Sequence, residues 1–165
     1  MTTAKTGAAP AGGANQGPVT FPSLAWFEAL VNVMRHNQAR YEHLGYTDCV
    51  MQFTVTDGAA GKPWSVRLTF DTYEVTEVAL ANPAREDITD FALEAPLAIW
   101  KAVIESTARN HGKPDPELTL NYLSLREPLF AITAEDQLRR DYFFRYNQTL
   151  QEFINDSRHL TTRFA

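Results

Sequence analysis

The sequence WSVRLTFD at residues 64–71 alternates between apolar and polar side chains at every position. A period of two is typical of a β-strand that buries one face and exposes the other. Neighbouring segments repeat the pattern. Residues 48–56 alternate in the same way and end at Asp57-Gly58, a turn signal, and further strands are predicted at 73–80 and 89–94. We expect these segments to form an antiparallel meander with one apolar face that other elements must cover.

Two helices are predicted on either side of these strands. Leu24, Phe27 and further apolar residues recur at helical spacing after Ser23, a plausible N-cap, and this helix is expected to end near Arg40. Pro96 fits the first turn of a second helix, because its missing N–H would be unpaired there, and this helix is expected to end near Asn110.

The C-terminal third predicts a last strand followed by a long helix. Residues 128–132 are short, apolar and β-prone, and Thr133 with Asp136 resembles a capping box. The following helix carries a stripe of large side chains, namely Leu138, Tyr142, Tyr146, Leu150, Phe153 and Ile154, with Phe143 beside it.

Residues 115–123 carry two conflicting signals. Asp115-Pro116 resembles the start of a helix, whereas Leu118, Leu120 and Tyr122 alternate as in a strand. The capping residues are the more specific signal, so we favour a short helix.

The length and composition indicate one domain. The chain has 165 residues, 44% of them hydrophobic, and we expect a single folded domain at residues 21–165. Residues 1–20 contain too few large apolar side chains to offset the cost of ordering them, so we expect a disordered tail. A linker or a tether to a partner would have the same composition.

Charge and cysteine content exclude several classes of function. The net charge of −5 opposes binding to nucleic acid and disfavours lasting adhesion to anionic membranes. No apolar stretch suggests a secretory signal or a membrane span. The single Cys49 cannot pair within the chain, so we expect a cytoplasmic protein.

No catalytic or metal-binding motif was found. The glycine-containing stretch at residues 57–63 lacks the spacing of a phosphate loop, and the four histidines have no ligand spacing. Cys49 shares a strand face with Met51 and Phe53, which predicts a buried core residue rather than a nucleophile. We therefore expect no catalytic residue, no metal and no cofactor, and we interpret the chain as not an enzyme.

The arginines of the last helix allow two interpretations. Asp136–Arg140 and Asp141–Arg145 have the spacing of i,i+4 ion pairs, which favours a solvated helical face. In the alternative, the arginines rim a cleft and bind a carboxylate or phosphate head group.

The order of elements resembles the sterol carrier protein type-two domain, a family of lipid-binding α/β modules, over about residues 21–156. The strongest likeness lies in the strand–helix junction TDFALEAPLAIWKAVI at residues 89–104 and in the hairpin strand at residues 64–71. The resemblance implies an α+β sandwich of two layers, with a five-stranded, mainly antiparallel sheet covered on one face by helices. It also implies a tunnel between sheet and helices and no catalytic residues.

The function that this resemblance implies is binding or transfer of fatty acyl, sterol-like or aromatic compounds. A hydrophobic small molecule would be the ligand. The expected apolar lining is Phe53, Leu68, Phe70, Phe91, Trp100, Ile104, Leu123, Phe130, Ile132, Phe143, Tyr146 and Leu150. An ordinary packed core would show the same stripes of apolar residues, so periodicity does not decide between a hollow and a filled interior.

Two positions differ from the family pattern. Thr133-Ala134-Glu135-Asp136 replaces a Gly-Asp turn, and Asp71-Thr72-Tyr73 lacks a usual glycine. These departures, the tail and the acidic charge motivate an alternative function: an accessory, non-catalytic subunit that docks on an enzyme handling hydrophobic substrates.

Overall fold

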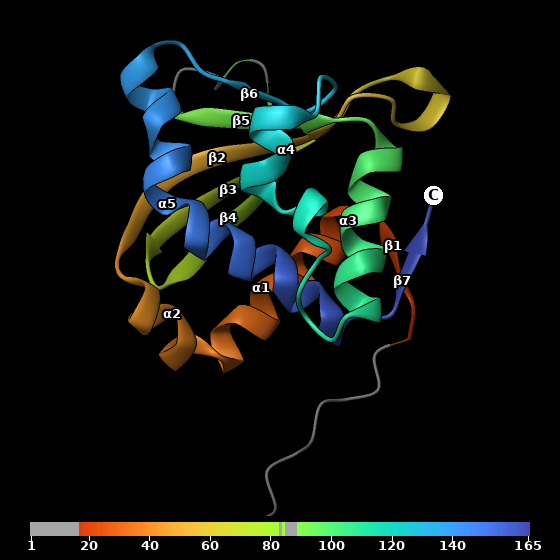
Figure 1. Cartoon of the computed structure of the whole chain (residues 1–165), viewed down its shortest axis with the longest axis horizontal. Coiled ribbons are helices and arrows are strands. Elements are labelled where there is room, and N and C mark those ends of the chain that lie inside the picture. The colour runs from red at the N-terminus through yellow and green to blue at the C-terminus, as the bar shows by residue number, and fades with distance from the viewer. Residues whose placement is uncertain (1–16, 83, 85–88) are drawn as a thin grey trace, which may run out of the picture.

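The alternating segments form one five-stranded sheet in the computed structural model, which describes residues 17–82, 84 and 89–165 (Figure 1). The strand order is β4 (Glu74–Leu80), β3 (Trp64–Thr72), β2 (Thr47–Val55), β5 (Phe91–Ala95) and β6 (Ala131–Thr133). The decisive strand β3 pairs with β2 along its whole length, from Thr47 opposite Thr72 to Val55 opposite Trp64. The expected strands are therefore confirmed.

The position of β5 corrects the predicted meander. β5 lies parallel to β2, whereas every other neighbouring pair in this sheet is antiparallel, so the sheet is mixed. All but one position of β5 is buried, as a strand between two others requires. Asp90 holds its start, because its carboxylate accepts a hydrogen bond from the Val50 N–H at 2.8 Å and its own N–H donates to the Val50 carbonyl at 2.8 Å. Alternation alone carries no information about strand order.

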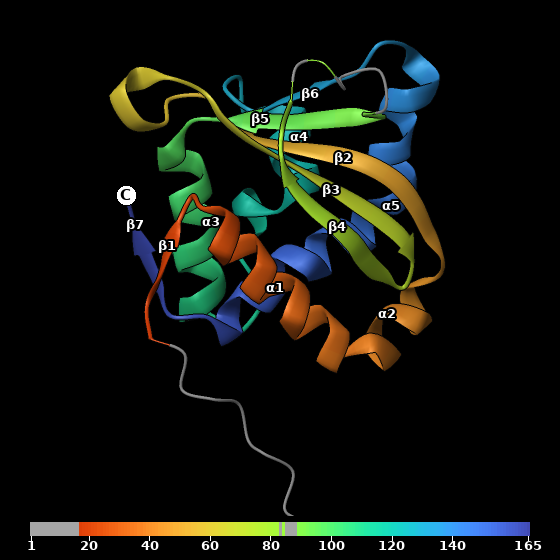
Figure 2. The same cartoon turned by 180° about the vertical axis from the view of Figure 1, so that it is seen from behind.

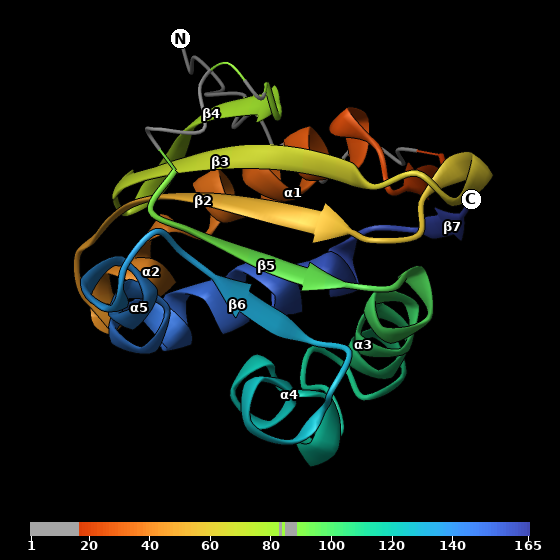
Figure 3. The ribbon, with the colours of Figure 1, turned by 90° about the horizontal axis from the view of Figure 1, so that it is seen from above.

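Helices cover one face of the sheet and complete a two-layer α+β sandwich, as expected (Figure 3). α5 (Gln137–Asn155) packs on β2, β5 and β6, and the short α4 (Leu120–Arg126) packs against α5. α3 (Leu97–Arg109) reaches the sheet through Trp100, whose ring lies against Phe53 of β2. α1 (Leu24–His36) packs along β4 and against α5, and α2 (Gln38–Leu44) follows it (Figure 2). One continuous core of apolar side chains lies between the two layers.

The first helix begins as predicted and ends differently. The Ser23 hydroxyl accepts a hydrogen bond from the Trp26 N–H at 3.1 Å, which confirms Ser23 as N-cap. The predicted single helix to Arg40 is instead two helices, because Asn37 leaves the helical conformation with φ −116° and ψ 27°. α2 then ends at Leu44, before the left-handed Gly45.

The predicted helix start at Asp115-Pro116 is confirmed only for a short 3₁₀ helix, and the predicted cap at Thr133 is wrong. Residues 115–123 do form a helix, but Asp115 precedes only a 3₁₀ turn at Pro116–Leu118, and Thr119 caps α4 by accepting from the Tyr122 N–H. Asp136 is not the partner of Thr133 in a capping box. It is itself the N-cap of α5, because its carboxylate accepts from the Arg139 N–H at 2.8 Å.

A second, two-stranded sheet joins the two ends of the described chain. β1 (Val19–Phe21) pairs in parallel with β7 (Thr162–Phe164), and the Trp26 indole N–H donates to the Thr162 hydroxyl at 3.0 Å. Neither strand was predicted from the sequence. Val19 and Thr20 were expected in the tail, and residues 1–16 of that tail lie outside the described residues.

The turn from β3 to β4 contains a threonine in a glycine-like conformation. Thr72 has φ 60°, in the left-handed region, and its hydroxyl donates to the Asp71 carboxylate at 2.9 Å. A β-branched residue is strained there, because its side chain crowds the backbone. The turn therefore keeps the backbone of a glycine turn although the sequence departs from the usual glycine.

Candidate functional site

The twelve residues expected to line a tunnel come together, but as a packed core. All twelve are buried and belong to the same apolar cluster between sheet and helices. Their rings contact one another closely: the ring centroids of Phe53 and Trp100 lie 3.9 Å apart, and the rings of Trp100 and Phe130 meet edge-on at 5.5 Å. The Trp100 indole N–H donates to the Thr54 carbonyl at 3.0 Å, which fixes this ring in the core.

A small cavity lies under α5. Its volume is about 10 Å³, roughly the space of one water molecule. The lining consists of apolar side chains from β2, β3, β5 and α5: Met51, Phe53, Leu68, Leu93, Leu150, Phe153 and Ile154. Three of the expected residues, Phe53, Leu68 and Leu150, face this cavity. At this cavity the chain's own side chains fill most of the space between the sheet and α5.

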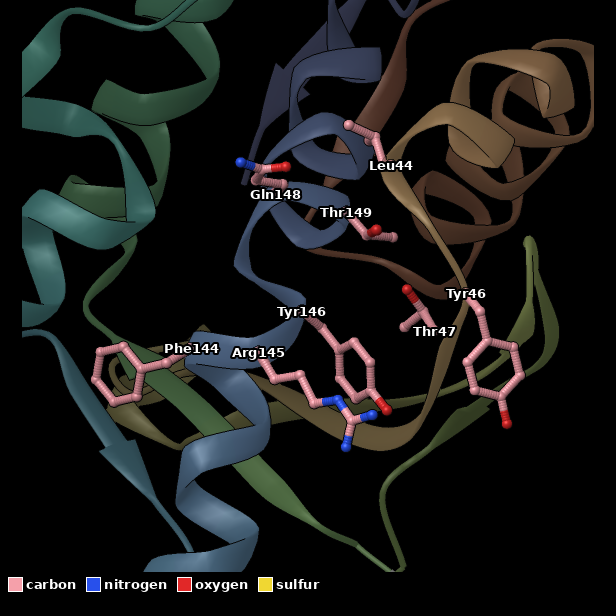
Figure 4. Close-up of a pocket in the computed structure, with 8 residues that line it drawn as sticks. All are labelled: Leu44, Tyr46, Thr47, Phe144, Arg145, Tyr146, Gln148 and Thr149. Atoms are coloured by element: carbon pink, nitrogen blue, oxygen red, sulfur yellow. The ribbon is translucent and has the colours of Figure 1, made fainter.

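An open cleft lies between α5 and the connection from α2 to β2 (Figure 4). Its volume is about 360 Å³. The lining residues are Leu44, Tyr46, Thr47, Phe144, Arg145, Tyr146, Gln148 and Thr149. We call this space the α5 cleft. Of the twelve expected residues, Tyr146 is the one that lines it, and Arg145 is one of the arginines for which a cleft rim was the alternative interpretation. Sequence reasoning missed the remaining six.

The α5 cleft presents a cation that is not neutralised by a carboxylate. Arg145 lies over the Tyr146 ring, with its guanidinium carbon 5.5 Å from the ring centroid. Within residues 17–82, 84 and 89–165, no carboxylate oxygen comes within 4.0 Å of its guanidinium nitrogens. The expected pair with Asp141 does not form, because an Asp141 oxygen accepts from the Gln137 amide at 2.6 Å.

The expected pair of Asp136 with Arg140 does not form either. Arg139 instead lies 3.7 Å from Glu135 and 4.0 Å from Asp136. The helix therefore matches the solvated-face interpretation near Arg139 and the cleft-rim interpretation at Arg145.

A buried hydroxyl borders the α5 cleft. Thr47 is 1% exposed, and its Oγ1 has no hydrogen-bond partner in the described part of the chain. Thr149 lies opposite on α5 and is also buried. Figure 4 shows Arg145 and Tyr146 extending from α5 toward the strand that carries Tyr46 and Thr47. A buried hydroxyl without a partner costs free energy, so a ligand that supplied a partner would recover it.

The cleft and the small cavity are both bordered by β2 and α5. Thr47 at the cleft and Met51 at the cavity share the inner face of β2, since they are four residues apart on a strand. On α5, Thr149 lines the cleft and the next residue, Leu150, lines the cavity. The two spaces therefore lie between the same strand and the same helix.

A buried polar cluster fastens the far end of α5 to α2. The Tyr41 hydroxyl donates to the Asp156 carboxylate at 2.5 Å, and Arg40 lies 3.1 Å from Glu152. Burial raises the pKa of both Tyr41 and Asp156, and for Asp156 the hydrogen bond from Tyr41 and the charge of Arg40 oppose this increase. Sequence reasoning missed this cluster, although Asp156 follows the apolar stripe of α5 directly.

The remaining features considered in the sequence were Cys49, a metal site and a membrane-spanning helix. Cys49 is 2% exposed and burial raises the pKa of its thiol, which agrees with the expected core position. Within the described residues no three His, Cys, Asp or Glu side chains gather in a way that could hold a metal ion. Likewise, no described helix is both long and apolar enough to cross a membrane.

Comparison with known proteins shows that this chain is similar in structure to two solved proteins, whereas the sequence comparisons found no match. No protein-family model matches the sequence, and no curated protein matches it. The crystal structure of a sterol carrier protein 2 superposes with a TM-score of 0.58 at 19% identity, covering 82% of this chain and 95% of that one. The chain has the fold of sterol carrier protein 2.

A second solved structure supports the sterol carrier fold. A conserved hypothetical protein from Thermus thermophilus, whose description links it to sterol carrier proteins, superposes with a TM-score of 0.61 at 19% identity. The match covers 86% of this chain and 90% of that one. The resemblance noted in the sequence is thus confirmed at the level of the sterol carrier fold.

Proposed function

We propose that this chain binds and carries hydrophobic small molecules beneath α5. The observation that carries the proposal is that β2 and α5 border both an open cleft and an apolar cavity. The fold supports it, because the two similar structures are described as sterol carrier proteins or linked to them.

The ligand would occupy space that the side chains of α5 fill in this structure. Leu150, Phe153 and Ile154 cover the cavity from the helix side, so a shift of α5 away from β2 would open it toward the cleft. Burial of apolar surface would drive this opening: each CH₂ removed from water contributes about 0.8 kcal/mol, and eight contribute about 6 kcal/mol before the costs of binding.

Titration with a fluorescent fatty acid such as cis-parinaric acid tests the proposal directly. We expect saturable binding at about micromolar concentration, together with co-purified ligand in native mass spectrometry. A protein that shows neither a titratable nor a co-purifying ligand would contradict it.

The proposed role is non-catalytic. Binding would show little preference for chain length, because an apolar site discriminates one methylene by only about 1–3 kcal/mol. Turnover of hydrophobic esters that is lost in Tyr146→Phe would argue for an enzyme instead. Docking on an enzyme complex stays a hypothesis from the sequence, and a pull-down from the native host is its test.

A further inference from the structure

We propose that the α5 cleft binds the anionic head group of an amphiphile whose apolar chain enters beneath α5. This inference rests on the proposed function and adds the chemistry of the ligand: a carboxylate or phosphate group on an acyl-like chain. The first observation is charge. The net charge of the chain is −5, yet the cleft presents the guanidinium of Arg145, which has no carboxylate partner among the described residues.

The second observation is the set of hydrogen-bond donors around that charge. Three of the residues that line the cleft, Thr47, Thr149 and Tyr146, carry hydroxyl groups, and Figure 4 shows these side chains between α5 and the start of β2. The Thr47 Oγ1 is buried and has no partner among the residues the structure describes. An anion has several oxygens and can accept from a guanidinium and hydroxyl groups at once.

One carboxylate near the cleft is already engaged. The Asp48 side chain accepts from the Tyr46 hydroxyl at 3.3 Å, on the strand side of the cleft opposite Arg145. The basic side of the cleft is therefore the α5 side, and α5 also borders the cavity. An amphiphile would place its head group beside Arg145 and its chain along Leu150 and Met51.

The third observation is the size of the two spaces. The cleft, about 360 Å³, accommodates a head group and the first carbons without any change in the chain. The cavity of about 10 Å³ takes nothing larger than a water molecule until α5 shifts. Head-group binding at the cleft would thus precede entry of the apolar chain.

The test compares a fatty acid, the fatty alcohol of the same length, and inorganic phosphate, using the full chain and isothermal titration. We expect the wild type to bind the acid about tenfold more tightly than the alcohol. Arg145→Gln should lose about fivefold for the acid, a reduced effect because the arginine is exposed, and should bind the alcohol unchanged. Arg163→Gln removes the same charge from the exposed strand β7 and should change neither affinity.

A second variant checks the buried hydroxyl. Thr47→Val keeps the shape of the side chain, removes the unpartnered oxygen, and should leave the fold intact. This variant should lower the affinity for the fatty acid about twofold to threefold and leave the affinity for the fatty alcohol unchanged.

The outcomes separate this inference from the proposed function. Equal binding of acid and alcohol, unchanged in Arg145→Gln, would overturn the head-group site and leave the carrier role standing. Failure of both amphiphiles to bind would overturn both proposals. If inorganic phosphate bound as tightly as the fatty acid, the cleft would be a site for free anions, and the proposal that it binds an amphiphile would be overturned.

Discussion

The hydroxyl of Tyr41 donates a hydrogen bond to the carboxylate of Asp156, 115 residues further along the chain, and neither side chain is exposed to solvent. This bond connects α2 with the end of α5, the helix that covers the apolar core. A buried carboxylate that loses its hydrogen-bond partner costs free energy, so separating Tyr41 from Asp156 is unfavourable. The bond therefore holds together the two elements on either side of the α5 cleft.

Removing the Tyr41 hydroxyl should destabilise the fold. We expect Tyr41→Phe to lower the free energy of unfolding by about 2 kcal/mol, since Asp156 would lose its shortest hydrogen bond while staying buried. Urea denaturation followed by circular dichroism measures the change. Tyr122→Phe, at a side chain that is 42% exposed, is the matched control and should stay within about 0.5 kcal/mol of the wild type. Equal effects of both variants would contradict the assignment.

The pH dependence of stability should reveal Asp156. Burial raises its pKa in the folded state above the ordinary value of 3.8, so the folded state binds the proton more tightly than the unfolded chain does. Its contribution to stability is therefore complete below pH 3.8 and is lost as the pH rises through the folded-state pKa. Asp156→Asn removes this titration. The stability of the wild type relative to Asp156→Asn should fall as pH increases, and a difference that stays flat across pH would refute the shift.

Thr72→Gly should stabilise the protein. The left-handed φ of 60° is strained for threonine and free for glycine, and we expect a gain of about 1 kcal/mol after the larger unfolded-state entropy of glycine is subtracted. Thr76→Gly in β4, which is not among the positive-φ positions, should instead lose stability. Thermal unfolding of both variants checks the sign, and a loss in both would mean that the turn is not strained.

Leu150→Ala should trade stability for binding space. Leu150 is 1% exposed and faces the small cavity, so truncation should cost about 2–5 kcal/mol and enlarge that cavity. A short apolar ligand should then bind more tightly than to the wild type. Leu125→Ala, at a side chain that is 66% exposed, should change neither quantity. If Leu150→Ala is too unstable to purify, Met51→Ala enlarges the same cavity from the sheet side.

Cys49 should report on opening of the sheet. The thiol is 2% exposed and burial raises its pKa, so a thiol reagent should react with the native protein only through unfolding or local opening. We expect reaction in urea to follow the unfolding curve. Fast reaction in native buffer would show that β2 is accessible in the folded state.

Local signals in the sequence were sufficient where one element decides its own structure. The alternation in β2 and β3, the Ser23 cap and the apolar stripe of α5 follow from periodicity and side-chain hydrogen bonding within a few residues. Strand order, in contrast, depends on which long-range pairs bury most surface. β5 beside β2 and β1 beside β7 have no short-range signature, so the meander and the tail boundary were wrong.

The candidate site was predicted only in part, for a related reason. Phe53, Leu68 and Leu150, which apolar periodicity placed in the interior, lie together around the small cavity. Whether that space is hollow depends on how the side-chain volumes fill it, and the periodicity of a sequence does not predict this. The polar members of the α5 cleft come from two segments about 100 residues apart, at the start of β2 and on α5. One local clue existed: Thr149 interrupts the apolar stripe between Tyr146 and Leu150.

The pairing of β1 with β7 has a practical consequence for every binding experiment. Strands β1 and β7, near the two ends of the described chain, lie beside α3, whereas the α2–β2 junction lies on the opposite side in the same view (Figure 1). A label or surface tether attached at Ala165 would therefore face away from the α5 cleft, the proposed entrance. An immobilised protein on a sensor would keep that entrance turned toward the solution.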